Sequence, residues 1–235
     1  MSKAVIVFRK EFRELVCVRS SLITGILFAL VFGVMYSLRL TSSDMPLALD
    51  RSLGSLLFFL ATIIGVFLGY SSTSQVFLRE KMDQVVETLL CSPAGLRDIW
   101  LGKTLAVTLF AHMMAFGTGI LASVVTSARL STVAIPNTAV ILYLLCVLPL
   151  VVACLVGALG FAQLLLGMKE NRIIGLALFT PLFAGLYSVG YTSTGTLAIG
   201  WLEVGVVALV AVGILCLLAW ASRFLSRERI VTSLS

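Results

Sequence analysis

Six long stretches of this chain contain no Asp, Glu, Lys or Arg, and this pattern constrains the fold more than any other feature. A hydrocarbon core about 30 Å thick is crossed by about 20 helical residues at 1.5 Å each. Backbone groups in a span must bond within that span, so we expect helices rather than the short alternating segments of a barrel. The uncharged stretches are residues 20–38, 52–78, 104–128, 130–168, 173–202 and 204–222.

The basic residues are concentrated in alternate gaps between these stretches. Of 17 Lys and Arg residues, 14 lie before the first stretch, in the second and fourth gaps, and after the last stretch. Cytoplasmic loops carry the basic excess, so we expect both termini on the cytoplasmic side. The net charge of +6 is therefore interpreted as an orientation signal, and no nucleic-acid partner is expected.

The sequence predicts an all-α integral membrane protein with six transmembrane helices, multi-pass in the cytoplasmic (plasma) membrane. The 235 residues leave no room for a separate soluble domain, so residues 1–235 are treated as one unit. An amphipathic helix over 3–19 is expected to lie on the inner membrane surface, with its basic residues near anionic lipid headgroups. The spans are placed at about 22–38, 53–76, 101–126, 138–166, 173–190 and 201–222.

Three local features are expected within the spans. Gly65 and Gly69 form a small-xxx-small pair that allows close helix packing, or they line a pathway. The polar run 71–75 either frays toward the interface, which we favour, or lines a wet cavity. Pro149 is expected to kink the fourth span.

The segment 78–100, between the second and third spans, differs from an ordinary loop. Its apolar residues recur at helical spacing, and a charged face lies opposite. Ser92 can cap a new helix and Pro93 suits its first position, so a helix–elbow–helix is predicted. The apolar residues are Leu78, Met82, Val85, Val86, Leu89 and Leu90. This unit is either a rigid lever or an interfacial hairpin that only shortens the connection.

The chain resembles the ABC-2 family of ABC transporter permeases, which are similar to type V exporters. The residues that carry this resemblance are Arg79-Glu80-Lys81, Glu87-Thr88-Leu89-Leu90-Cys91-Ser92-Pro93, Gly102-Lys103 and Arg223-Phe224-Leu225-Ser226-Arg227-Glu228-Arg229. The six spans and the surface helix before the first span match the same family. Many relatives have a re-entrant helical pair between spans five and six, whereas only residues 191–200 are available here.

The resemblance implies that 78–100 is a cytoplasmic coupling helix, which docks on a separate ATPase. It places Arg79, Glu80, Lys81, Glu87, Leu89, Leu90 and Pro93 at or beside that contact. It also implies two ATPase subunits and a second permease copy, identical or closely paralogous. ATP and Mg²⁺ would be bound by the ATPase, and this chain would bind no cofactor or metal.

Other motifs give weaker indications. Gly102-Lys103-Thr104 imitates a phosphate-binding loop, but Arg97 occupies the required glycine position, so no ATP hydrolysis by this chain is expected. His112 and Glu203 are ionisable residues of the spans, each of which serves either in a pathway or in packing. The spans, with almost no charge, suggest a hydrophobic or amphipathic substrate. The alternative function is an autonomous channel or secondary transporter, for which His112 would be the midplane group.

Overall fold

The computed structural model describes residues 3–42, 49–78, 95–130, 136–165 and 199–222, together with 177, 180–181, 183–186 and 188. These residues form an all-helical protein. The elements are α1 (Lys3–Cys17), α2 (Arg19–Ser42), α3 (Leu49–Thr73), η2 (Ser74–Leu78), α6 (Leu96–Leu130), α7 (Thr138–Leu142), η3 (Tyr143–Val147), α8 (Leu148–Leu165) and α10 (Trp201–Ala221).

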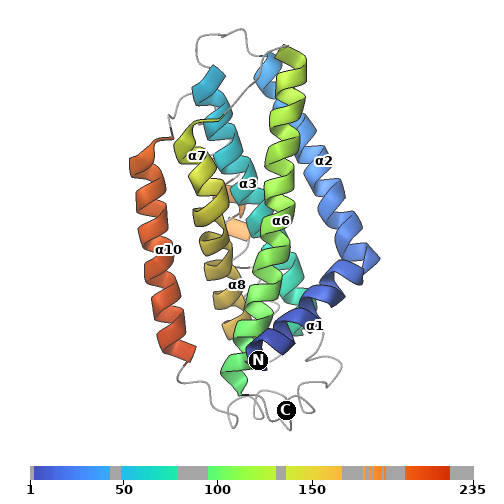
Figure 1. The fold of residues 1–235 in the computed structure, drawn as a ribbon, viewed down its shortest axis with the longest axis vertical. Helices are drawn as coiled ribbons and strands as arrows, with labels where there is room; N and C mark the ends of the chain where they lie inside the picture. The colour runs from blue at the N-terminus through green and yellow to red at the C-terminus, as the bar shows by residue number, and fades with distance from the viewer. Residues whose placement is uncertain are drawn as a thin grey trace.

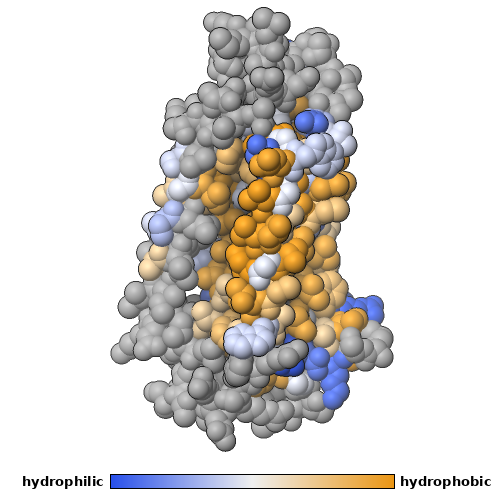
Figure 2. Space-filling model, turned by 90° about the vertical axis from the view of Figure 1, so that its left-hand side faces the viewer, coloured by the Kyte–Doolittle hydropathy of each residue, from blue (hydrophilic) through white to orange (hydrophobic). Residues whose placement is uncertain are grey.

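Four helices are long and apolar enough to cross a membrane. They cover Leu53–Phe77, Leu96–Arg129, Thr138–Leu164 and Trp201–Ala221. A fifth crossing results if α1 and α2, which meet at a bend of 66°, are counted as one broken span. On the face that α10 covers, apolar residues form a band through the middle of the described surface, with hydrophilic residues above and below (Figure 2). These features are those of a multi-pass membrane protein.

Helix α6 is the centre of the bundle, and it packs against α1, α2, α3 and α8 (Figure 1). Helix α3 is almost wholly buried, whereas α10 packs mainly on α8 and exposes most of its surface. Helices α2 and α6 run in one direction along the long axis, and α3, α8 and α10 run in the other. We call the end of the bundle at which α1 lies the basal end, and the opposite end the distal end.

Most sequence predictions that fall on described residues agree with the helices. The amphipathic helix predicted over 3–19 is α1, with Glu11 and Leu15 buried. The third span is longer than predicted, because α6 begins at Leu96. Helix α2 contains the predicted span 22–38, and α3 with η2 contains the predicted span 53–76. The predicted span 138–166 corresponds to α7, η3 and α8, which end at Leu165, and the predicted span 201–222 corresponds to α10. Most of span 173–190 lies outside the described residues.

The polar run 71–75 does not fray, so the favoured prediction for it is wrong. The helix continues through it into the π-turn η2, and both Ser72 and Thr73 are buried. The Thr73 hydroxyl donates to the Gly69 carbonyl at 2.6 Å. A hydroxyl that bonds the preceding turn of its own helix carries no unpaired donor into the membrane, so this end of α3 stays helical.

The irregularity expected at Pro149 is a π-turn just before it. Proline has no N–H, and its ring clashes with the carbonyl four residues earlier, here that of Leu145. Leu145 lies in η3, and a π-turn is one of the recognised ways in which a helix relieves such a conflict.

Gly65 and Gly69 provide close packing between α3 and α8. A Cβ at Gly65 would lie 2.9 Å from Val152 Cγ2, and one at Gly69 would lie 3.2 Å from Val156 Cγ2. Of the two roles predicted for this pair, packing is the one that the geometry supports.

Candidate functional site

The predicted ATPase-contacting residues fall outside the described residues. These are Arg79, Glu80, Lys81, Glu87, Leu89, Leu90 and Pro93. The structure does describe the chain on both sides of them. We call residues 74–77 the first root of the predicted coupling segment and residues 95–103 the second root. What holds these two roots decides how a force on the segment would reach the spans.

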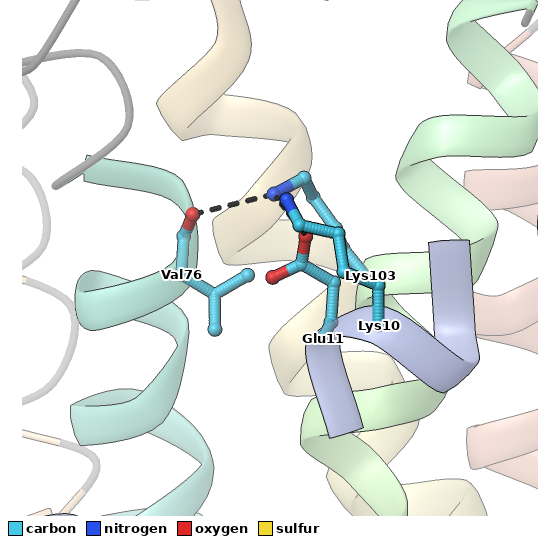
Figure 3. Close-up of polar contacts among 4 residues, drawn as sticks. All are labelled: Lys10, Glu11, Val76 and Lys103. Atoms are coloured by element: carbon cyan, nitrogen blue, oxygen red, sulfur yellow. Dashed lines mark hydrogen bonds and ion pairs between the residues drawn. The ribbon is translucent and has the colours of Figure 1, made fainter. Parts of the chain in front are cut away.

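The second root carries a buried cation at the basal end of α6. Lys103 Nζ lies 3.4 Å from Glu11 Oε1 of α1, and the side chains of Lys103 and Glu11 are only 2% and 5% exposed. Lys103 Nζ also donates to the Val76 carbonyl in η2 at 3.5 Å and lies 5.5 Å from the Phe77 ring centroid. Three elements far apart in the sequence therefore meet at one ammonium group (Figure 3).

The same carboxylate has a second basic neighbour. Lys10 Nζ lies 3.4 Å from Glu11 Oε1, and the Lys10 side chain is 60% exposed. Glu11 is thus shared between a buried lysine of α6 and a solvent-facing lysine of its own helix. A buried charge is costly unless it is paired, so this arrangement fixes the position of α1 on α6.

Gly102 brings the backbones of α1 and α6 into direct contact, one residue before Lys103. A Cβ on Gly102 would lie 2.7 Å from the Ala4 carbonyl oxygen and 2.8 Å from Val7 Cβ. Both neighbours are parts of a helix that cannot move singly, so only glycine fits here. Each residue of Gly102-Lys103 therefore contributes to the attachment of α1.

Two aromatic residues, one on each root, pack against glycines of α8. A Cβ at Gly160 would lie 2.8 Å from the Phe77 ring, which belongs to the first root. On the second root, buried Trp100 donates from Nε1 to the Gly157 carbonyl at 3.3 Å. Both ends of the coupling segment are thus attached to the same helix, one helical turn apart.

The second root also contacts α10. Arg97 Nε donates to the Ser222 carbonyl at 3.2 Å, directly after the last residue of α10. Carbonyls at a helix C-terminus lack partners within the helix, and the helix dipole favours a cation there. The contacts of the two roots with each other and with α1, α8 and α10 are collectively called the basal junction.

The remaining predicted site residues are placed elsewhere. Glu203 Oε2 accepts from the Gly200 N–H at 2.8 Å, which caps the first turn of α10. His112 lies midway along α6, half-buried beside Phe116, and its Nδ1 has no hydrogen-bond partner among the described residues. Glu203 therefore stabilises the start of its own helix, and His112 has a buried nitrogen that no described residue pairs.

The described contacts of the junction are an ion pair, hydrogen bonds and close packing between helices. No group of three His, Cys, Asp or Glu side chains within the described part of the chain could hold a metal ion. Glu11, Phe77 and Gly160 are the junction residues that sequence reasoning missed. For Glu11 a signal existed, because it lies three residues after Phe8 and four before Leu15, on the apolar face of the predicted helix.

Comparison with models of known protein families gives no match, and comparison with curated proteins gives none either.

Proposed function

We propose that this chain is the transmembrane subunit of an ATP-driven exporter of the ABC-2 type, which moves a hydrophobic or amphipathic substrate across the cytoplasmic membrane. Two copies, identical or closely paralogous, would form the pathway. Two cytoplasmic ATPase subunits would bind ATP and Mg²⁺ and grip the coupling segments. The observation that carries this proposal is the attachment of the two roots to each other and to α1, α8 and α10 at the basal junction.

The junction can convert a local push into movement of whole helices. Helix α6 has 35 residues, so it extends about 50 Å from the second root. A displacement of residues 95–103 acts at once on α1 through Glu11, on α8 through Gly157 and on α10 through Ser222. Because packed helices shift as rigid bodies between discrete arrangements, such a push favours switching over gradual deformation.

The direction of the helices supports a six-span count with both termini on one side. Helix α8 ends at the basal end, whereas α10 begins at the distal end and ends beside Arg97. The chain between Leu165 and Ile199 therefore connects opposite ends of the bundle, as span five would. The exposed apolar residues of α2 and α10 are available to lipid and to the second copy.

The alternative is an autonomous channel or secondary transporter. Its support is His112, which is the single histidine of the chain and lies midway along α6 with Nδ1 unpaired among the described residues. A proton- or ion-coupled transporter uses ionisable groups near the midplane. The charged residues of the predicted spans, Lys103 and Glu203, lie at the starts of α6 and α10 rather than near the midplane, so the ATP-driven function is preferred.

The test is partnership with an ATPase. Candidate ATPase subunits are co-expressed and co-purified with the chain, and ATP hydrolysis is measured with the complex in nanodiscs. Glu80→Lys and Glu87→Lys are expected to abolish co-purification or at least the permease-stimulated hydrolysis. Glu203→Lys is the matched control, because it makes the same charge reversal at the start of α10, at the distal end.

Two results would contradict the proposal. One is full stimulation in both reversal variants. The other is substrate movement by the purified chain in vesicles without any ATPase, together with its loss in His112→Gln, which would establish the alternative function.

A further inference from the structure

The exposed side of α1 is strongly basic, and the basal junction does not use it. Arg9, Lys10 and Arg13 are exposed, and Glu14 is the acidic residue among them. Arg9 and Arg13 are four residues apart, so they lie on one face of the helix. Neither arginine pairs with a described residue, whereas Lys10 is near Glu11. This face therefore presents two guanidinium groups that no described residue pairs.

The charged residues border a hollow. Its cavity volume is about 630 Å³, and the described residues that line it all belong to α1, namely Ile6, Arg9, Lys10, Arg13, Glu14 and Cys17. Guanidinium groups match phosphate in charge and in bidentate geometry.

Apolar surface begins at the edge of this hollow. Val5, Ile6 and Val16 of α1 are exposed, and the exposed apolar residues continue on α2 with Ile23 and Leu27. A soluble anion would use only the arginines and would leave this surface uncovered. A molecule with a phosphate head and an apolar tail matches both parts.

We propose that the exposed face of α1 binds the headgroup of an anionic phospholipid, with Arg9 and Arg13 as the phosphate ligands and the acyl chains against the exposed apolar residues of α1 and α2. Lys10 joins the site from its place beside Glu11. The site lies on the opposite side of α1 from the contact with Gly102 and Lys103, so lipid and junction hold the helix from two sides. This inference does not depend on an ATPase partner.

The test is lipid binding to the purified full chain, measured by native mass spectrometry with phosphatidylglycerol and phosphatidylcholine. One basic residue near an anionic lipid surface contributes about fivefold in affinity. Arg13→Gln is therefore expected to weaken phosphatidylglycerol binding about fivefold, and Arg9→Gln with Arg13→Gln about thirtyfold. Phosphatidylcholine binding should not change in either variant.

Two variants serve as controls. Arg129→Gln removes one exposed arginine at the other end of α6 and should leave phosphatidylglycerol binding within twofold of wild type. The double variant Arg9→Lys with Arg13→Lys keeps the charge and should retain most of the phosphatidylglycerol binding. Its retention would show that the loss in the double glutamine variant is due to the lost charge and not to misfolding.

Three outcomes would overturn the inference. Equal affinity of the wild-type chain for the two lipids would show that charge is not recognised. Wild-type phosphatidylglycerol binding by the double glutamine variant would show that the arginines are not the ligands. Complete displacement of the lipid by millimolar glycerol phosphate would identify a soluble anion as the natural occupant. Failure of ATPase partnership would change none of these readouts.

Discussion

The ion pair between α1 and α6 gives the sharpest test of the basal junction. The perturbation is a set of three variants in which methionine, an unbranched apolar residue of similar length, replaces Glu11, Lys103 or both. The two side chains are 5% and 2% exposed and lie 3.4 Å apart. Each single variant leaves one buried charge behind, and the double variant leaves neither.

The magnitudes follow from the partners that remain. Removing one member of a buried ion pair typically costs about 3–5 kcal/mol. Glu11→Met leaves Lys103 buried without its carboxylate, so this full range is expected. Lys103→Met leaves Glu11 beside Lys10, which is 60% exposed, so a smaller cost of about 1–3 kcal/mol is expected. The double variant should lie within about 1 kcal/mol of wild type, because apolar replacements of both charges are often neutral or stabilising.

The free energy of unfolding is measured by equilibrium SDS titration in mixed micelles, followed by tryptophan fluorescence. Glu14→Met is the matched control, because it makes the same change on the exposed side of α1 and should stay within about 0.5 kcal/mol of wild type. The double variant should be more stable than the sum of the single losses by at least about 3 kcal/mol. If the losses of the single variants simply add, the two charges do not interact and the reasoning is refuted.

Three further predictions concern packing in the same bundle. Gly102→Leu should detach the start of α1 from α6 and lower the free energy of unfolding by about 1–3 kcal/mol. The measurement is proteolysis of α1, which should become faster, and an unchanged rate would contradict the close approach of the two helices. Gly160→Val should cost a similar amount through its clash with Phe77, and Phe77→Ala in the same chain should recover part of that loss in the SDS titration. Tyr143→Phe removes the hydrogen bond to the Thr62 hydroxyl and should cost only about 0.6 kcal/mol, and a loss above about 2 kcal/mol would indicate a larger network.

The fold was largely predictable because membrane helices are coded locally. The described residues of the uncharged stretches are helical except at 136–137 and 199–200, and the amphipathic pattern of residues 3–19 predicts α1 to within two residues. The predicted fraying at 71–75 is wrong because composition shows only that a run is polar. A hydroxyl in a helix can donate a hydrogen bond to a carbonyl of the preceding turn, as Thr73 does to Gly69. Composition does not reveal this bond.

The junction was less predictable because its contacts connect residues distant in the sequence. The resemblance pointed to Gly102-Lys103, but no local pattern says that Gly102 faces Ala4 or that Lys103 pairs with Glu11. Phe77 and Gly160 belong to two spans that are separated in the sequence by the third span, and they become neighbours only in the folded bundle. Glycine is common in membrane helices, so the sequence alone could not single out Gly160.

The double methionine variant also separates stability from transmission. Gly102 lets α1 approach α6 closely. Apolar contacts such as those of Phe12 and Leu15 would still form if α1 shifted along α6. A single buried ion pair permits one register only, and fixing a register is the best-attested use of buried charge. The double variant should therefore keep wild-type stability while α1 loses its fixed position. In the complex with an ATPase, its stimulated hydrolysis should fall severalfold. Wild-type stimulation would show that α1 takes no part in coupling.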